Sequence, residues 1–204
     1  MSTKEEWYAK FFNYGAYTAG HAIFNNTMTG IITDPSGAEI YDNEPFFDTA
    51  HPDKVGNTYS NFNTSYSLTE ANLKTVYNQY TITNAKDERA EFIELTPDVL
   101  LIPNALKFTA QEILNTTLIP NSMDNTINVL HTIVEPMAWR YLTDADGWFL
   151  GQKKKGLMAT SRETANLDFW QDELNKDFFA SIIERWGGTI TNWRSFIANA
   201  ISTS

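Results

Sequence analysis

The stretch Thr96-Pro97-Asp98-Val99-Leu100-Leu101-Ile102-Pro103 decides the fold of this sequence. Its four consecutive aliphatic residues stand between two prolines, and proline does not continue a regular helix or a central strand. A short apolar run with such ends is typical of a strand whose two faces are both buried. The stretch therefore predicts a core strand at 99–102.

The residues on either side of this strand predict helices. Ser67-Leu68-Thr69-Glu70 has the spacing of a capping box, and apolar residues recur behind it at helical intervals as far as Tyr80. After the strand, Pro103 opens an apolar periodic segment that runs to Leu114. We expect one helix at about 67–80 and another at 103–114.

Further short apolar runs predict additional strands. These runs are Phe92–Leu95, Ile127–Val134 and Trp148–Leu150, and the polar segment 143–147 before the last of them predicts a tight turn. Helix and strand therefore alternate through the middle of the chain.

The N-terminal segment predicts an amphipathic helix of about 20 residues. Thr3-Lys4-Glu5-Glu6 is a second capping box, and the apolar residues Trp7, Phe11, Tyr14, Tyr17 and Ala22 follow at helical spacing. Gly15 and Gly20 each weaken it by about 1 kcal/mol relative to Ala, so tertiary packing must hold it. Turn-forming units between 28 and 63 predict loops and short strands.

The C-terminal segment predicts a long hairpin. Two runs, 178–186 and 189–193, are suited to strands and flank Gly187-Gly188, which we expect to form the turn. The apolar face of this hairpin is expected to pack on the N-terminal helix. The residues expected to meet are Phe178, Phe179, Ile182, Ile183, Trp186, Ile190 and Trp193 from the hairpin, and Trp7, Phe11, Tyr14 and Ile23 from the helix.

Composition narrows the class of protein. The 204 residues include 15 Lys and Arg against 25 Asp and Glu, and the net charge of −10 argues against a basic nucleic-acid-binding domain. With 42% hydrophobic residues the chain is too apolar for intrinsic disorder, yet it has no run of the roughly 18–20 apolar residues that a membrane helix needs. The N-terminus resembles no signal peptide, so we expect a cytoplasmic site of synthesis and a single mixed α+β body.

Few residues are available for chemistry. There is no cysteine, which excludes disulfides, thiolate metal sites and a cysteine nucleophile. The three histidines, His21, His51 and His131, form no zinc-binding motif, and for His21 and His131 we expect a core or interface position. Asp48, His51 and Asp53 form the nearest approach to a metal site, although Pro52 and the preceding phenylalanines favour a structured turn.

Other motifs are weaker still. Asp144-Ala145-Asp146-Gly147 resembles the start of a calcium loop, but the twelfth position is Lys155, so a turn capped by Asp is favoured. Gly-rich phosphate loops and the Gly-x-Ser-x-Gly elbow are absent from the sequence. The six Trp and nine Tyr allow a sugar-binding platform, yet core or subunit-interface positions are favoured for Trp139, Trp148, Trp170 and Trp186. The residues thus predict no catalytic site, no metal and no cofactor, which points towards a structural or assembly role.

Several short segments follow one another in a characteristic order. They are 22–29, 41–52, Ser60-Asn61, 96–103, 105–114, Asn128-Val129, Leu142-Thr-Asp-Ala-Asp-Gly-Trp-Phe-Leu150, Arg185-Trp-Gly-Gly188 and Asn192-Trp-Arg194. Their order resembles the major capsid proteins of Mu-like and related tailed phages. Asn43 stands where glycine is usual in that pattern.

This resemblance implies an HK97-type capsid fold. It would place a peripheral domain at 1–65, with the N-terminal helix as its spine, an axial domain at 66–165, and a return to the peripheral domain with the β-hairpin at 166–204. The N-terminal arm and the extended loop that precede the spine helix in the family are expected to be missing.

The function implied is that of a structural subunit of an icosahedral phage capsid. It would self-assemble into pentamers and hexamers around double-stranded DNA in the virion, with scaffold, portal and other head proteins as further partners, no membrane and little direct DNA binding. The alternative from the residues is a carbohydrate-binding or metal-dependent hydrolytic module that uses Asp48, His51 and Asp53.

Overall fold

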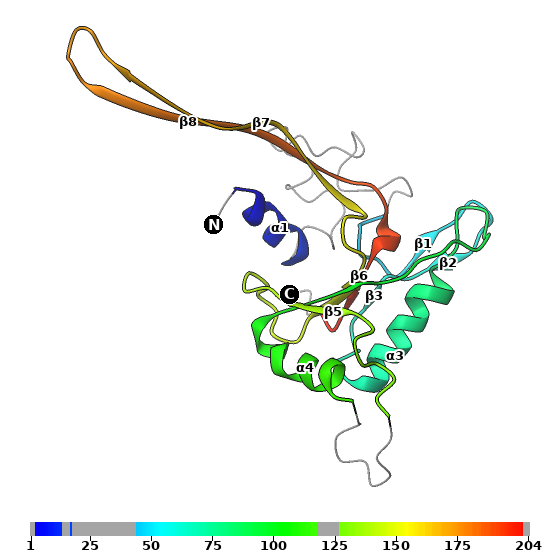
Figure 1. Cartoon of the computed structure of the whole chain (residues 1–204). Coiled ribbons are helices and arrows are strands. Elements are labelled where there is room, and N and C mark those ends of the chain that lie inside the picture. Colours follow the sequence, from blue (N-terminus) through cyan, green and yellow to red (C-terminus); the bar gives the residue numbers. More distant parts are fainter. Residues whose placement is uncertain (1–2, 14–16, 18–43, 118–126, 202–204) are drawn as a thin grey trace.

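The computed structural model describes residues 3–13, 17, 44–117 and 127–201, and it has mixed α+β architecture (Figure 1). A five-stranded sheet forms the centre, two helices lie below it, and a long two-stranded ribbon extends away from it. The helices of the described part are α1 (Thr3–Asn13), α3 (Glu70–Asn78) with the π-helical turn Gln79–Thr83, and α4 (Lys107–Asn115), which follows the 3-10 turn Asn104–Leu106.

The central sheet has the strand order β3-β9-β6-β4-β5. Its strands are β3 (Phe62–Asn63), β4 (Val99–Ile102), β5 (Glu135–Ala138), β6 (Trp148–Gly151) and β9 (Phe196–Asn199). β6 is antiparallel to both β4 and β9, whereas β4 pairs with β5 and β3 pairs with β9 in parallel. The strands predicted at 99–102 and 148–150 are therefore confirmed.

Both faces of the central sheet are covered, which explains why its inner strands are continuous apolar runs. Every residue of β4, β6 and β9 is buried. Leu100, Leu150 and Ile197 face α3 and α4, whereas Leu101 and Phe149 face α1 and the segment that contains Phe46. Strands with water on one face would alternate apolar and polar residues instead.

The predicted helices beside β4 are confirmed, with a later start for the first. The hydroxyl of Thr69 accepts a hydrogen bond from the backbone N–H of Asn72 at 3.2 Å, so Thr69 rather than Ser67 caps α3. At the far end, the buried Tyr80 donates a hydrogen bond to the carbonyl of Ser195, which lies just before β9. This bond connects the helix to the end of the chain.

The N-terminal helix is confirmed over Thr3–Asn13, and the rest of the segment predicted as helix lies outside the described residues apart from Tyr17. The loops and strands predicted between 28 and 43 and the position of His21 also lie outside them. Within 44–63, the short strands β1 (His51–Pro52) and β2 (Thr58–Tyr59) pair antiparallel.

The long ribbon consists of β7 (Leu157–Gln171) and β8 (Phe178–Ile190), and the predicted turn at Gly187-Gly188 is wrong. Both glycines lie inside β8, where they pair with Thr160 and Ala159. The chain reverses at 172–177, where the Asp172 side chain accepts a hydrogen bond from the N–H of Leu174 and Lys176 has a positive φ of 58°. A side-chain bond to the nearby backbone thus provides the turn that glycine was expected to provide.

The base of the ribbon packs on α1, as predicted, but its outer part does not. The rings of Trp186 and Trp7 lie edge to face at 6.3 Å, Ile190 shares a core cluster with Trp7 and Phe11, and Lys4 forms an ion pair with Glu184. Phe178, Phe179, Ile182 and Ile183 lie further out, where they are exposed. Tyr14 and Ile23, the other expected helix contacts, lie outside the described residues.

Two predicted strands are absent from the described structure. Residues 127–134 form turns, and β5 begins only at Glu135. The reason is Asn128, whose amide donates to the carbonyls of Ile113 and Thr116 while its oxygen accepts from the N–H of Leu130. These bonds hold a turn that buries Leu130 without strand pairing.

The second predicted strand that is absent is the one at 92–95. Phe92 forms only an isolated bridge with Lys86 there. His131 was expected to lie in an apolar strand, either in the core or at a subunit interface. It is instead exposed in the turn after Asn128, so the expected strand and core position are wrong.

Candidate functional site

The outer half of the β7–β8 ribbon exposes apolar side chains on both of its faces. Residues paired across the two strands share a face, so Trp170 lies with Phe179, and Leu167 lies with Ile182 on the opposite face. The exposed fractions range from 41% for Phe179 to 72% for Phe178. The set comprises Leu167, Phe169, Trp170, Phe178, Phe179, Ile182 and Ile183, and we call it the ribbon surface.

Within this surface the aromatic rings stack on each other rather than on the body of the protein. Trp170 and Phe179 lie 5.7 Å apart with nearly parallel rings, and Phe169 and Phe178 form a similar pair at 5.7 Å. Such pairs stabilise a ribbon by about 0.2–1 kcal/mol each. The four rings still keep between 41% and 72% of their surface exposed. The ribbon surface is therefore available to a partner.

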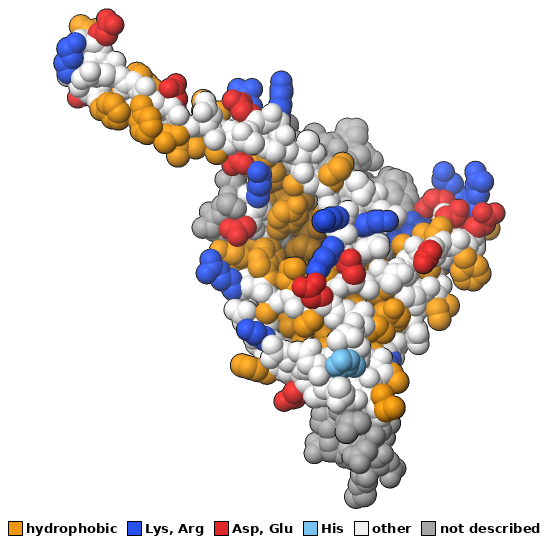
Figure 2. All heavy atoms as spheres, viewed as in Figure 1, with side chains coloured by type: hydrophobic (Ala, Val, Ile, Leu, Met, Phe, Trp, Pro, Cys, Tyr) orange, Lys and Arg blue, Asp and Glu red, His pale blue; other side chains and the backbone are white. Residues whose placement is uncertain are grey.

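The tip of the ribbon is acidic. Between 168 and 177 there are four carboxylates, Asp168, Asp172, Glu173 and Asp177, and one basic residue, Lys176, so the net charge is −4 + 1 = −3. Leu174, at the turn itself, is 92% exposed. Figure 2 shows this arrangement at the upper left, with the hydrophobic stripe along one side of the ribbon and charged groups at its end.

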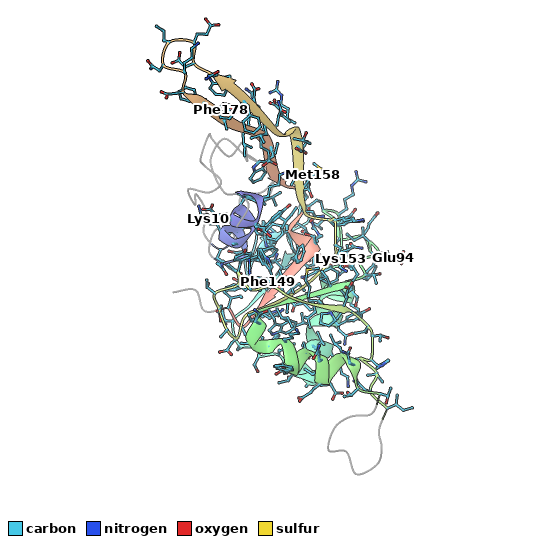
Figure 3. All side chains as sticks on the ribbon, turned by 60° about the vertical axis from the view of Figure 1, so that its left-hand side comes forward. Lys10, Glu94, Phe149, Lys153, Met158 and Phe178 are labelled. Atoms are coloured by element: carbon cyan, nitrogen blue, oxygen red, sulfur yellow. The ribbon has the colours of Figure 1, made fainter. Side chains whose placement is uncertain are left out.

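A groove of about 940 Å³ lies at the other end of the ribbon, between its base, α1 and one end of the central sheet. Figure 2 shows a hollow with orange walls below the base of the ribbon, and in Figure 3 this region lies between Met158 on the ribbon and Lys153 below it. The apolar walls are formed by Tyr8, Phe12, Leu95, Val99, Leu101, Met137, Trp139, Leu157, Met158 and Phe196.

The groove has a basic rim. Lys153, Lys154, Lys155 and Arg194 line it, against a single acidic residue, Glu5. Lys153 forms an ion pair with Glu135, and the buried Arg194 forms one with Glu88. Lys154 and Lys155 are exposed, and no ion pair is seen for them within the described residues. The rim therefore offers two cationic side chains to a partner.

Gly156 explains how the basic run turns into β7. It has a positive φ of 77°, and a Cβ atom there would lie 1.6 Å from the Ser195 hydroxyl oxygen. Only glycine fits both the backbone conformation and this close approach. The tight contact places Lys154 and Lys155 directly at the edge of the groove.

Asp48, His51 and Asp53, the residues of the alternative hydrolytic or carbohydrate-binding module, serve the local structure. His51 is buried, with its ring stacked on that of Trp193 at 4.2 Å and its Nε2 3.0 Å from the side-chain oxygen of Asn61. Asp48 accepts a hydrogen bond from the N–H of Ala50. These contacts hold the β1–β2 turn against the 3-10 turn Trp193–Ser195.

Asp53 is the centre of the same turn. Burial raises the pKa of its carboxyl, but hydrogen bonds from the Asn57 side chain and from the N–H groups of Asn57 and Val55 outweigh that effect and hold the pKa at about 2, below the ordinary 3.8. The Tyr59 hydroxyl donates a further bond at 3.2 Å. The carboxylate is thus engaged by donors of the turn, and the described residues contain no group of three side chains suited to hold a metal ion.

Asn61 is the residue that sequence reasoning missed. Its buried amide nitrogen donates to the carbonyls of Phe46, Trp193 and Phe196, and its oxygen accepts from the N–H of Asp48. It thereby joins the loop before β1 to the last strand. Ser60-Asn61 belonged to the resemblance, but no local pattern showed that this amide bridges distant segments.

The other predicted features are partly confirmed. Asp144 caps its turn by accepting from the N–H groups of Asp146 and Gly147. Trp148 is a core anchor, Trp139 and Trp186 are half-buried beside the core, and Trp170 lies on the ribbon surface. Among the described helices, none has the length and hydropathy required to cross a bilayer.

Part of the chain matches a known protein family. Residues 60–138, a segment that runs from just after β2 through β5, match the family described as the Mu-like prophage major head subunit gpT. The resemblance to the Mu-like major head subunits predicted from the sequence is confirmed over this segment, which makes up less than half of the chain.

Among solved structures, the chain is similar to one from Mycobacterium phage Che8, with 10% sequence identity and a TM-score of 0.42. The similarity covers 70% of this chain and 54% of that one, so the chain spans about half the length of the structure it matches. No curated protein matches the sequence.

Proposed function

We propose that this protein is a structural subunit of an icosahedral phage capsid, which self-assembles into pentamers and hexamers that enclose double-stranded DNA. The observation that carries the proposal is the ribbon surface, because it exposes apolar side chains on both faces of only two strands. An isolated two-stranded ribbon is marginally stable in water, and exposed apolar patches of this kind mark interaction sites. Neighbouring subunits would cover it.

The HK97-type division of the chain belongs to this proposal. The peripheral domain would comprise 1–65 and 166–204, with α1 as the described part of its spine and with β8 and the outer part of β7, from residue 166 onward, as its hairpin. The axial domain would comprise 66–165, which includes the start of β7 at Leu157. The contact of Trp186 with Trp7 supports the pairing of spine and hairpin. The central sheet takes strands from all three sections, since β3 and β9 lie together at one edge of the sheet, beside the strands β6, β4 and β5 of the middle section.

The experiment is sedimentation velocity and negative-stain electron microscopy of the full chain. We expect large assemblies from the unchanged protein and their loss in Phe178→Ser/Ile182→Ser, which removes two residues that are 72% and 70% exposed. Phe108→Ser/Ile127→Ser is the matched control, because these residues are 73% and 72% exposed on the body. A chain that stays monomeric at the highest attainable concentration would overturn the proposal.

A capsid subunit has a defined location and defined partners. The subunit would reside in the phage head after synthesis in the host cytoplasm, with scaffold and portal proteins as further partners and no catalytic activity. Its net charge of −10 would keep it from adhering to packaged DNA. Tight binding of duplex DNA by the purified protein at roughly 0.15 M salt would contradict this part.

A further inference from the structure

We propose that the tip of the β7–β8 ribbon of one copy docks into the basic, apolar groove at the base of the ribbon of the next copy. The inference rests on the proposed self-assembly and specifies which two surfaces meet. One copy would insert Leu174 and the aromatic pairs of the ribbon surface, which lie nearest the turn. The neighbouring copy would receive them in the groove lined by Met137, Trp139 and Met158.

The two surfaces cannot meet within one chain. Met158 lines the groove at the start of β7, and Gln171 ends the same strand at the tip. At about 3.3 Å per residue the strand between them spans about 40 Å. Figures 1 and 3 show the ribbon running outward from the body, with Phe178 far from Met158. A tip that enters this groove must therefore come from another copy.

The surfaces are complementary in both polarity and charge. The tip combines exposed aromatic rings with a net charge of −3, and the groove combines apolar walls with the exposed Lys154 and Lys155 at its rim. The aromatic side chains would enter the apolar part, while Glu173 and Asp177 would approach Lys154 and Lys155 at the rim. Opposite charges at the edge of an apolar contact set its orientation and its rate of formation.

The mode of contact is the insertion of side chains rather than the addition of a strand. β5 is the edge strand of the sheet beside the groove, and its second residue is Pro136, which has no N–H to donate. Extending the sheet by another strand at this edge would lose a hydrogen bond. The side chains of Met137, which follows Pro136, and of Trp139, just after β5, offer an apolar surface instead.

This geometry has a consequence for symmetry. The tip and the groove are different surfaces of the same chain, so the contact is head to tail and leaves one tip and one groove free at the ends of any open chain. Such a contact continues until the rotation between neighbours closes a ring. One pairing of surfaces can thus link every subunit of a ring.

A charge exchange tests the pairing, with assembly measured by sedimentation as a function of concentration. The tip variant Glu173→Lys/Asp177→Lys and the rim variant Lys154→Glu/Lys155→Glu should each raise the concentration at which half of the protein assembles by about tenfold or more, because like charges then face each other. The chain that carries all four substitutions should regain assembly. Lys107→Glu and Glu112→Lys, at exposed positions on α4, are the control reversals and should change little.

Crosslinking gives an independent test, because the chain contains no cysteine. Leu174→Cys and Met158→Cys chains of different mass, mixed and oxidised, should form a mixed disulfide in excess of either self-linked product. Leu174→Cys mixed with Val55→Cys, whose side chain is exposed on the β1–β2 turn, should not.

Assembly without charge rescue and without the mixed disulfide would overturn the tip-and-groove pairing while leaving self-assembly intact. A chain that does not assemble at all would overturn both proposals.

Discussion

The indole of Trp7 in the first helix lies 6.3 Å from that of Trp186 in β8, with their planes at 75°, although the two residues stand near opposite ends of the chain. The ring of Trp7 also covers Gly188, where a Cβ atom would lie 3.4 Å from it. This contact anchors the base of the ribbon on α1, so it determines the direction in which the ribbon leaves the body.

The tryptophans of this region should differ in their contribution to stability. Trp193 is fully buried and stacks on His51, so Trp193→Ala should lower the free energy of unfolding by about 3–5 kcal/mol. Trp186 is only partly buried, so Trp186→Ala should cost less than that range. Trp170→Ala, on the exposed ribbon surface, is the control. Urea unfolding measures all three, and equal losses for Trp170 and Trp193 would contradict the assigned burial.

Asn61 should be a stability centre. Asn61→Ala would leave the carbonyls of Phe46, Trp193 and Phe196 without this donor in a buried site, and an unsatisfied buried polar group costs about 1–3 kcal/mol. We expect a loss at or above the top of that range. Asn115→Ala, at the exposed end of α4, is the matched control. An unchanged urea midpoint in Asn61→Ala would show that the amide does not connect these segments.

Asp53 should make the β1–β2 turn sensitive to acid. Because its pKa is held at about 2 in the folded chain and is near 3.8 when unperturbed, the unfolded chain takes up the proton first. The stabilisation is therefore complete above about pH 4 and is lost as the pH falls towards 2. Asp53→Asn should remove this part of the acid dependence, which unfolding measured between pH 2 and 5 would detect. Asp146→Asn, at an exposed turn, should leave it unchanged.

Gly156, just before β7, and Gly187, within β8, should respond oppositely to substitution. Gly156→Ala introduces a Cβ at positive φ and against Ser195, and the backbone strain alone costs about 1–2 kcal/mol. Gly187→Ala meets no atom within 4 Å and should be neutral or stabilising by about 0.4–1 kcal/mol. Thermal unfolding of the two variants compares them directly, and a stable Gly156→Ala chain would refute the close approach to Ser195.

The sequence by itself determined the elements that local chemistry specifies. The apolar run 99–102 between prolines and the turn capped by Asp144 were predicted where the structure has them. The helices predicted at about 67–80 and at 103–114 are also present, although α3 and α4 begin a few residues later. In each case the signal lies within a few residues of sequence, as in a helix cap or a continuous apolar run between prolines. The resemblance to phage major head proteins likewise depended on the order of short motifs.

Only the tertiary structure decided which surfaces are buried and which remain exposed. The apolar pattern of 178–193 is the same whether it covers a helix or projects into solvent, and the structure buries Ile190 while it exposes Ile182. The turn of the ribbon was misplaced for a related reason, since Gly187 and Gly188 have the conformational freedom for a turn but pair within β8, where Gly188 makes room for Trp7. Contacts between residues far apart in the chain are set by packing, and local periodicity does not encode them.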